Sequence, residues 1–251
     1  MKKYLNLVCA SVVMFIMTGC VKLMADEVED LEYDHRSAPG RSAKAILSAK
    51  RFTELHIEIQ YMKGFKPQDE AIDELQTFLK QFIHKPGGLS FSLEEIPVQA
   101  DSVLTTEGVK KIEENYRKHY SQGDRLATYV LITDGLYTNN RLLGLAYQNT
   151  SVVLFGKHIA RNSDRFKKPG RSDLESRVLQ HEFGHLLGLV NLGADQIEEH
   201  QDAEHGNHCT NRSCLMYYLT DTDGYPSVLL KKDPPKLDKN CMADLRALRD
   251  H

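Results

Sequence analysis

Two histidines stand four residues apart in the run His181-Glu182-Phe183-Gly184-His185. On a helix this spacing places both rings on one face about one turn apart, so both can reach a single metal ion. Glu182 lies between them, where a carboxylate can act as general base toward a metal-bound water. The motif therefore indicates a centre for metal-assisted hydrolysis, with Glu182 as its catalytic residue. Five-residue matches also arise by chance on amphipathic helices, so the residues that follow the motif decide whether it marks a metal site.

The motif supplies only two of the three protein ligands that a catalytic zinc requires beside its open position. In the longer form of the motif, a glycine three residues after the second histidine turns the backbone, and a third histidine follows three residues later. Gly188 occupies the glycine place, but Asn191 occupies the histidine place. An amide oxygen is a poor zinc ligand, so the third ligand must come from elsewhere.

A second chemical segment, His208-Cys209-Thr210-Asn211-Arg212-Ser213-Cys214-Leu215-Met216, follows further along the chain. Its His-Cys pair, its four-residue gap and its Cys-x-Met ending closely resemble the signature of the archaemetzincins, zinc metallopeptidases of the metzincin clan. The resemblance implies that His208 is the third zinc ligand and that Met216 forms the methionine turn under the metal. About seventeen residues are then inserted before His208, which costs only about one or two kcal/mol of loop entropy. A bound metal can offset that cost.

Other side chains in the inserted segment remain alternatives for the third ligand: His200, His205, Glu199 and Glu204. Glu204 lies near the spacing at which thermolysin-like peptidases place a glutamate on a helix, but Gly206 and Asn207 disfavour a helix here. We therefore expect His208. The acidic side chains of the insertion could also gather a calcium ion, although they follow no defined ligand spacing; they are Asp195, Glu198, Glu199, Asp202 and Glu204.

Tyr218 lies two residues after Met216. Some metzincins swing a tyrosine hydroxyl from this place toward the metal or the developing oxyanion, so the resemblance makes Tyr218 a second catalytic candidate. An aromatic side chain packed near the site is the alternative.

Three cysteines remain after the N-terminal region. In the archaemetzincin pattern a later cysteine pair joins Cys209 and Cys214 around a second zinc, but here only Cys241 follows them. Three thiolates do not close a tetrahedral zinc site without another ligand. We therefore expect one catalytic zinc, with Cys209 and Cys214 either joined in a disulfide that staples the loop or free.

The remaining pattern alternates strands and helices. Alternating or continuous apolar residues predict strands, and apolar residues at helical spacing predict helices. Strands are expected near 55–59, 89–93, 127–133, 142–147 and 152–155, and helices near 67–83, 105–120, 172–188 and 237–248. Ser172 and Glu175 form a capping box at the start of the motif helix.

This order predicts an α+β fold, an α/β-like sandwich with a mixed twisted sheet, the active-site helix and a C-terminal helix. The resemblance implies a metzincin-like zincin domain of this kind. In metzincins an edge strand just upstream of the motif helix frames the cleft and pairs with an extended substrate. We expect that role for residues 143–147, and an edge strand without a ligand is the alternative.

The N-terminus is typical of an exported protein. Lys2 and Lys3 precede an apolar run from residue 5 to 17, which is too short to span a membrane and suits a secretory signal. Cys20 follows Thr18-Gly19, which resembles the bacterial lipobox and implies lipidation of Cys20. An ordinary cleaved signal is the alternative. The polar residues that follow predict a tether. We expect a signal peptide at 1–19, a lipidated N-terminus and tether at 20–50, and a metallopeptidase domain at 51–251.

Charge limits the partners. The formal net charge of −3 becomes −5 when Lys2 and Lys3 leave with the signal, so nucleic acid is not expected as a partner. We expect a monomer in the bacterial cell envelope, lipid-anchored and facing the periplasm or the cell exterior.

The function expected from these residues is hydrolysis of peptide bonds in a peptide or protein substrate by a zinc-dependent endopeptidase, with a water activated by Glu182. One alternative is a surface lipoprotein that binds zinc and a partner but has no peptidase activity. In this alternative, the insertion before His208 covers the open coordination position of the zinc. A further, weaker alternative is a precursor whose residues 21 to 50 block the cleft.

Overall fold

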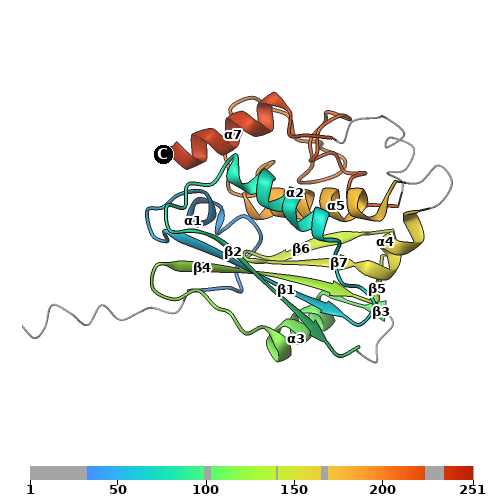
Figure 1. Ribbon diagram of the computed structural model, residues 1–251. Helices are drawn as coiled ribbons and strands as arrows, with labels where there is room; N and C mark the ends of the chain where they lie inside the picture. Colours follow the sequence, from blue (N-terminus) through green and yellow to red (C-terminus); the bar gives the residue numbers. More distant parts are fainter. Residues whose placement is uncertain (1–32, 99–102, 140, 165–168, 224–234, 251) are drawn as a thin grey trace, which may run out of the picture. The chain divides into compact units, whose positions relative to one another are not determined.

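A five-stranded mixed sheet forms the centre of the fold (Figure 1). The strands are β1 (Glu54–Met62), β2 (Gly88–Ile96), β4 (Arg125–Thr133), β6 (Gly144–Gln148) and β7 (Ser151–Phe155), in the order β2-β1-β4-β7-β6. Neighbouring strands from β2 to β7 run parallel, and β6 runs antiparallel to β7 at one edge. A separate parallel pair joins β3 (Val103–Leu104) to β5 (Leu136–Tyr137). The mixed sheet and the hairpin predicted from the sequence are confirmed.

Helices cover both faces of the sheet. α2 (Asp69–Lys80) and α5 (Arg171–Leu186) lie over one face and α3 (Thr106–Tyr116) over the other (Figure 1). α1 (Ala43–Leu47), α4 (Gly156–Asn162) and the C-terminal α7 (Lys239–Asp250) complete the helices described here. Two apolar cores result, one between the sheet and α5 and a smaller one beneath α3. The fold is an α/β sandwich, as the sequence predicts.

Two local features differ from the sequence expectations. The alternating residues of β1 predict a half-buried strand, but β1 is buried along nearly its whole length, because β2 and β4 flank it and helices cover both faces. The motif helix α5 begins at Arg171, and no side chain caps it. The carboxylate of Glu175 instead accepts hydrogen bonds from Gln68 N, at 2.8 Å, and from Arg171 Nε, at 2.7 Å. Glu175 therefore joins the start of α5 to the segment that precedes α2.

The segment from residue 33 to 50 is packed against the domain, where the sequence predicted a tether. Ile46 and Leu47 of α1 are fully buried in the main core. Lys85 anchors this segment, because its Nζ donates to the carbonyls of Ala45, Ser48 and Phe52 at 2.6 to 2.7 Å. The domain in this structure therefore includes residues from 33 onward.

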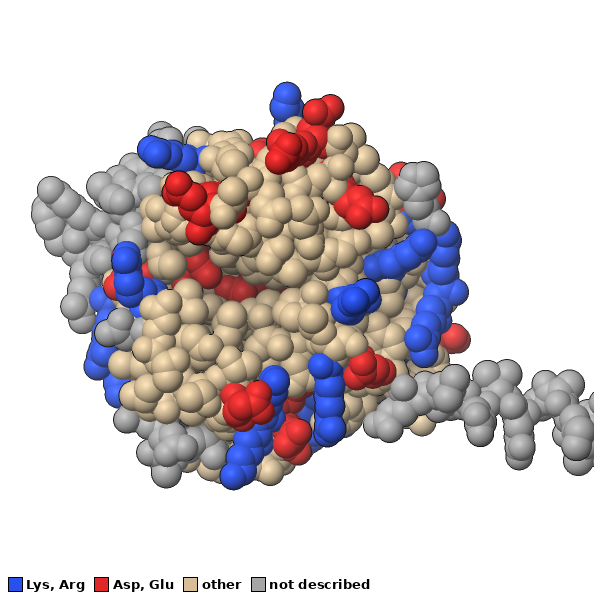
Figure 2. All heavy atoms as spheres, turned by 180° about the vertical axis from the view of Figure 1, so that it is seen from behind, with Lys and Arg blue, Asp and Glu red and all other residues tan. Residues whose placement is uncertain are grey.

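The structure describes residues 33–98, 103–139, 141–164, 169–223 and 235–250. The predicted signal peptide, Cys20 and the first part of the predicted tether lie outside these residues. Within the described ranges, no helix combines the length and the apolar character needed to cross a membrane. On the face in Figure 2, basic and acidic side chains alternate around a largely uncharged surface, and acidic side chains lie in a hollow across it.

Candidate metal centre

Three histidine rings meet beside the C-terminal half of α5. His181 and His185 project from the same face of this helix, and their Nε2 atoms lie 3.1 Å apart. Two nitrogens bound to one tetrahedral zinc stand at about the same separation, roughly 3.3 Å. His208 completes the group, with its ring centroid 5.2 Å from each of the other two. One ligand nitrogen from each ring lies within 4.8 Å of the others.

Backbone carbonyls orient two of these rings. His181 Nδ1 donates to Leu215 O at 2.8 Å, and His208 Nδ1 donates to His205 O at 2.7 Å. These bonds place the proton on Nδ1 and leave Nε2 as a free lone pair facing the other rings. His208 Nε2 is buried and has no hydrogen-bond partner among the described residues. A buried lone pair of this kind suits a metal ion, so the residues present fit the zinc that the motif implies.

The insertion closes at its base, and this closure positions His208. Asn207 Nδ2 donates to Val190 O at 2.9 Å, which brings the end of the loop beside its beginning. His208 thereby lies next to the place of Asn191, whose own side chain turns away to Gln201. The closed loop therefore brings His208 beside the two histidines of α5.

The competing ligands lie elsewhere. His205 is paired with Asp202 and stacked on Tyr218, while the ring of His200 lies 3.4 Å from Cys241 Sγ. Glu199 and Glu204 are exposed. Within the described residues, no candidate metal group includes the acidic side chains of the insertion, so the calcium ion considered for this loop gains no support.

Met216 lies directly under the motif helix. Its side chain is fully buried, and a Cβ added at Gly184 would stand 2.3 Å from the Met216 sulfur. Only glycine leaves room for the sulfur at this point. The central glycine of the motif therefore allows the segment around residue 216 to pass beneath the histidines.

Glu182 faces the edge strand from α5. Its Oε2 accepts the N–H of Ala146 in β6 at 2.7 Å, and its Oε1 has no partner among the described residues. A Cβ at Gly144 would stand 2.7 Å from Oε1, so glycine is needed where β6 passes α5. Glu182 thus has one oxygen fixed by the sheet and one that is open for proton transfer.

Burial keeps the imidazoles neutral. Desolvation, with the charge of His208 as a smaller cause, lowers the pKa of His181 to about 3. Burial likewise lowers the pKa of His185 well below its usual value and lowers that of His208. Burial also raises the pKa of Glu182 well above its usual value, and the nearby Asp221 raises it further. Neutral imidazole is the form that binds a metal.

Tyr218 is not part of the histidine group in this structure. Its ring is stacked on His205 at a centroid distance of 3.5 Å and contacts the ring of Tyr217. No described contact joins Tyr218 to His181, His185 or His208.

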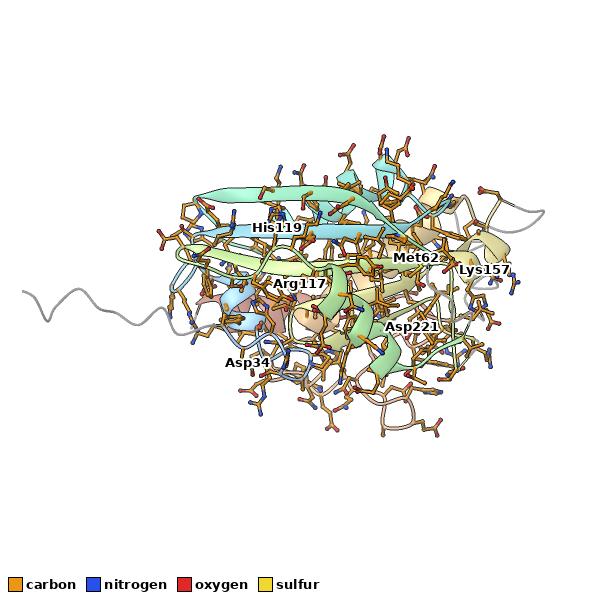
Figure 3. The ribbon with its side chains drawn as sticks, turned by 90° about the horizontal axis from the view of Figure 1, so that it is seen from below. Asp34, Met62, Arg117, His119, Lys157 and Asp221 are labelled. Atoms are coloured by element: carbon orange, nitrogen blue, oxygen red, sulfur yellow. The ribbon has the colours of Figure 1, made fainter. Side chains whose placement is uncertain are left out.

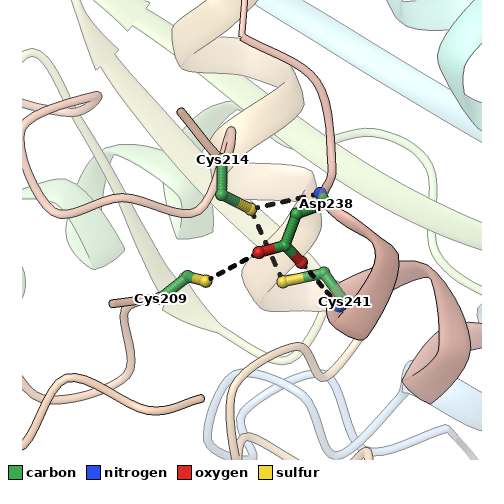
Figure 4. Close-up of side chains that lie close together, drawn as sticks. All are labelled: Cys209, Cys214, Asp238 and Cys241. Atoms are coloured by element: carbon green, nitrogen blue, oxygen red, sulfur yellow. Dashed lines mark hydrogen bonds between the residues drawn. The ribbon is translucent and has the colours of Figure 1, made fainter. Parts of the chain in front are cut away.

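A second candidate metal group lies where the loop after His208 meets α7 (Figure 4). Ligand atoms of Cys209, Cys214, Cys241 and Asp238 lie within 4.8 Å of one another. The three cysteines are free, and Cys214 Sγ and Cys241 Sγ stand 3.6 Å apart, far beyond the length of a disulfide bond. Of the two states expected for Cys209 and Cys214, a disulfide or free thiols, the structure shows free thiols.

Backbone N–H groups point at the sulfurs of this group. Cys214 Sγ accepts from Met216 N and from Asp238 N, and Cys209 Sγ accepts from Asn211 N, each at 3.4 Å. Hydrogen bonds from the Cys209 and Cys241 thiols lower the pKa of Cys214 to about 4, while hydrogen bonding to Cys214 raises the pKa of Cys209 to about 12. Cys214 is therefore the thiol of this group that ionises most readily.

Sequence reasoning missed two acidic residues. Asp238 lies with the three cysteines as a fourth candidate ligand, and its position three residues before Cys241, directly before α7, was the available signal. Asp221 lies beside the histidine group, with Oδ2 4.0 Å from His208 Nε2. No spacing rule in the sequence pointed to Asp221.

The comparisons with known proteins identify the fold. No family model matches the chain, and no curated protein sequence matches it. The crystal structure of archaemetzincin from Methanopyrus kandleri is similar, with a TM-score of 0.54 and 13% identity over 79% of this chain and 97% of that chain. Metalloproteinase-II from Bacteroides fragilis aligns with a TM-score of 0.45 and 14% identity over 88% of this chain and 57% of that chain. The chain has an archaemetzincin-like fold.

Proposed function

We propose that the chain is a zinc-dependent endopeptidase whose zinc is held by His181, His185 and His208. The convergence of three neutral imidazoles beside Glu182 carries this proposal. A zinc ion held there would polarise the peptide carbonyl and lower the pKa of a water toward neutrality. The likeness to archaemetzincin supports the fold in which such a site is built.

Glu182 performs the proton transfers in this proposal. Its Oε1, the oxygen without a partner among the described residues, takes a proton from the water whose oxygen attacks the carbonyl carbon. The same oxygen then gives that proton to the nitrogen of the leaving amine as the C–N bond breaks. The bond from Ala146 N to Oε2 holds the carboxylate in one orientation throughout. An extended substrate would pair with β6, which is the edge strand of the sheet.

The second group is proposed as a structural metal site. Cys209, Cys214 and Cys241 would hold a zinc with Asp238 as the oxygen ligand, a closed set of four. This group joins the residue that follows His208 to α7. A metal here therefore stabilises the segment that carries the third histidine.

Glu182→Gln tests the peptidase directly. The amide cannot accept the proton, so hydrolysis of a quenched peptide library is expected to fall by about 10² to 10⁴ in kcat/KM while zinc content stays unchanged. Glu204→Gln, a change at an exposed carboxylate of the insertion, is the matched control and is expected to cleave like wild type. Cleavage that persists in Glu182→Gln would refute the mechanism.

Lipid anchoring, envelope location, a monomeric state and the absence of nucleic-acid binding are proposed from the sequence alone. Growth of expressing bacteria with labelled palmitate is expected to label the wild-type protein, since Cys20 would carry acyl chains, and not a Cys20→Ser variant. Equal labelling of the two would contradict the lipobox assignment.

A further inference from the structure

A second carboxylate, that of Asp221, lies beside the histidine group. Asp221 Oδ2 lies 4.0 Å from His208 Nε2, and an oxygen of Asp221 lies within 4.8 Å of ligand atoms of both His181 and Glu182. The residue is 8% exposed, and its Oδ1 has no hydrogen-bond partner among the described residues. Figure 3 labels its position in the view from below the sheet.

The backbone fixes Asp221 at this position. Its carbonyl accepts the N–H of Leu143 at 2.7 Å, and Asp223 N donates to Arg141 O at 2.8 Å. Between these bonds, Thr222 forms an antiparallel bridge with Leu142. Residues 221–223 follow a turn and are thus held by backbone hydrogen bonds to residues 141–143, just before β6. The Asp221 carboxylate is aimed at the histidines by main-chain pairing, and a rotation of its side chain suffices to alter its distance from them.

In their charged forms, two carboxylates so close together need a compensating cation. Two buried carboxylates, those of Glu182 and Asp221, stand together, and the nearby rings are neutral. Burying a charged carboxylate is unfavourable unless an opposite charge compensates it. A divalent ion between the histidines supplies that charge. The 4.0 Å from Asp221 Oδ2 to His208 Nε2 exceeds the roughly 3.3 Å between ligands of a tetrahedral zinc by less than 1 Å.

We propose that Asp221 is a fourth protein ligand of the histidine-bound metal in the resting protein, and that water and substrate must displace it. The proposal rests on the proposed function and adds a regulatory element to the same site. With Asp221 bound, the open coordination position of a catalytic zinc is filled, and Glu182 has no water to deprotonate. Displacement is an exchange of ligands in which no covalent bond of the protein forms or breaks.

Cobalt(II) titration of the metal-free protein tests this assignment. Cobalt d–d bands report the histidine site, and thiolate charge-transfer bands report the cysteine group separately. Asp221→Asn is expected to weaken cobalt binding at the histidine site at least about tenfold, because a charged ligand is lost. Asp223→Asn is the matched control, since Asp223 pairs with Arg141 on the same segment, and it is expected to bind like wild type. Equal affinity of Asp221→Asn and wild type would overturn the proposal.

Two further measurements test the Asp221 ligand separately, in case Asp221→Asn folds poorly or the protein is not a peptidase. A crystal structure of the zinc-loaded wild type is expected to show Asp221 Oδ2 about 2.0 to 2.2 Å from the zinc, and a water in that place would overturn the proposal. If cobalt binding weakens while wild type shows no Glu182-dependent cleavage, the ligand assignment stands and the proposed function fails. If cleavage depends on Glu182 and cobalt binding is unchanged, only the ligand assignment fails.

At saturating zinc, Asp221→Asn is expected to cleave peptides several-fold faster than wild type, because water no longer competes with a carboxylate for the metal. A fall in kcat/KM at full zinc occupancy would contradict a blocking role.

Discussion

Helical spacing explains why the sequence predicted part of the metal centre. His181 and His185 are separated by one helical turn, and a turn places side chains on one face whatever surrounds the helix. The position of His208 does not follow from helical spacing, because it depends on the hydrogen bond from Asn207 to Val190 that closes the insertion. Asp221 reaches the site only through backbone pairing with Leu143, a contact far apart in the sequence. Local spacing therefore predicts ligands on one helix, whereas ligands from loops depend on tertiary contacts.

Zinc stoichiometry distinguishes the two proposed metal groups. The wild-type protein is expected to bind about two equivalents, His208→Ala about one, and Cys241→Ser about one, because each change removes a ligand from a different site. His205→Ala is the matched control for His208→Ala, since His205 lies on the same loop but is paired with Asp202. The measurement is zinc per protein after gel filtration. A loss of one equivalent in His205→Ala, with none in His208→Ala, would reassign the third ligand.

The elements were predicted well because their patterns are local. The apolar run of β4 forms a strand at the expected residues, and α3 begins where expected, with the Thr105 side chain accepting from Gly108 N. The predicted capping box at the start of α5 does not form, because the Glu175 carboxylate instead accepts hydrogen bonds from the N–H of Gln68 and the guanidinium of Arg171. A capping box is a local preference of a few tenths to about 2 kcal/mol, and a buried carboxylate with two donors outweighs it.

Gly184→Ala tests the packing of α5 on the segment that carries Met216. The added Cβ would stand 2.3 Å from Met216 Sδ, so we expect a loss of about 1 to 3 kcal/mol in unfolding free energy from overpacking. Gly108→Ala in α3 is the matched control, because its Cβ would make ordinary contacts at 3.5 Å or more. That variant is expected to be neutral or more stable by up to about 1 kcal/mol. Urea unfolding of the zinc-loaded proteins measures both, and equal stability of the two variants would refute the packing account.

At the scale of the whole molecule, the segment from residue 33 to 50 departs most from the sequence reading. Its polar composition predicts a tether, yet it is held by burial of Ile46 and Leu47 and by a buried polar cluster around Arg117 (Figure 3). His35 takes part in that cluster through Nδ1 to Thr150 Oγ1, at 2.9 Å, and Ser121 N to Nε2, at 3.2 Å. Composition alone does not reveal such contacts, because each partner lies more than eighty residues away.

His35 makes the stability of this packing depend on pH. Burial, followed by the charge of Arg117, lowers the pKa of His35 to about 4. Between pH 6.5 and 4 the unfolded chain therefore binds more protons at this site than the folded chain, so stability is present above pH 6.5 and is lost as pH falls toward 4. The unfolding free energy, measured by chemical denaturation across this range, is expected to depend less steeply on pH in His35→Gln than in wild type. The difference in slope corresponds to at most about one proton. Identical slopes in the two proteins would contradict a buried neutral His35.

The proposed function depends on one zinc ion held by His181, His185 and His208. The most direct measurement is anomalous diffraction at the zinc absorption edge from crystals of the zinc-loaded protein. We expect an anomalous peak about 2.0 to 2.1 Å from the Nε2 atoms of all three histidines. A zinc peak coordinated by His200 or His205 in place of His208, or no peak beside His181 and His185, would contradict the account.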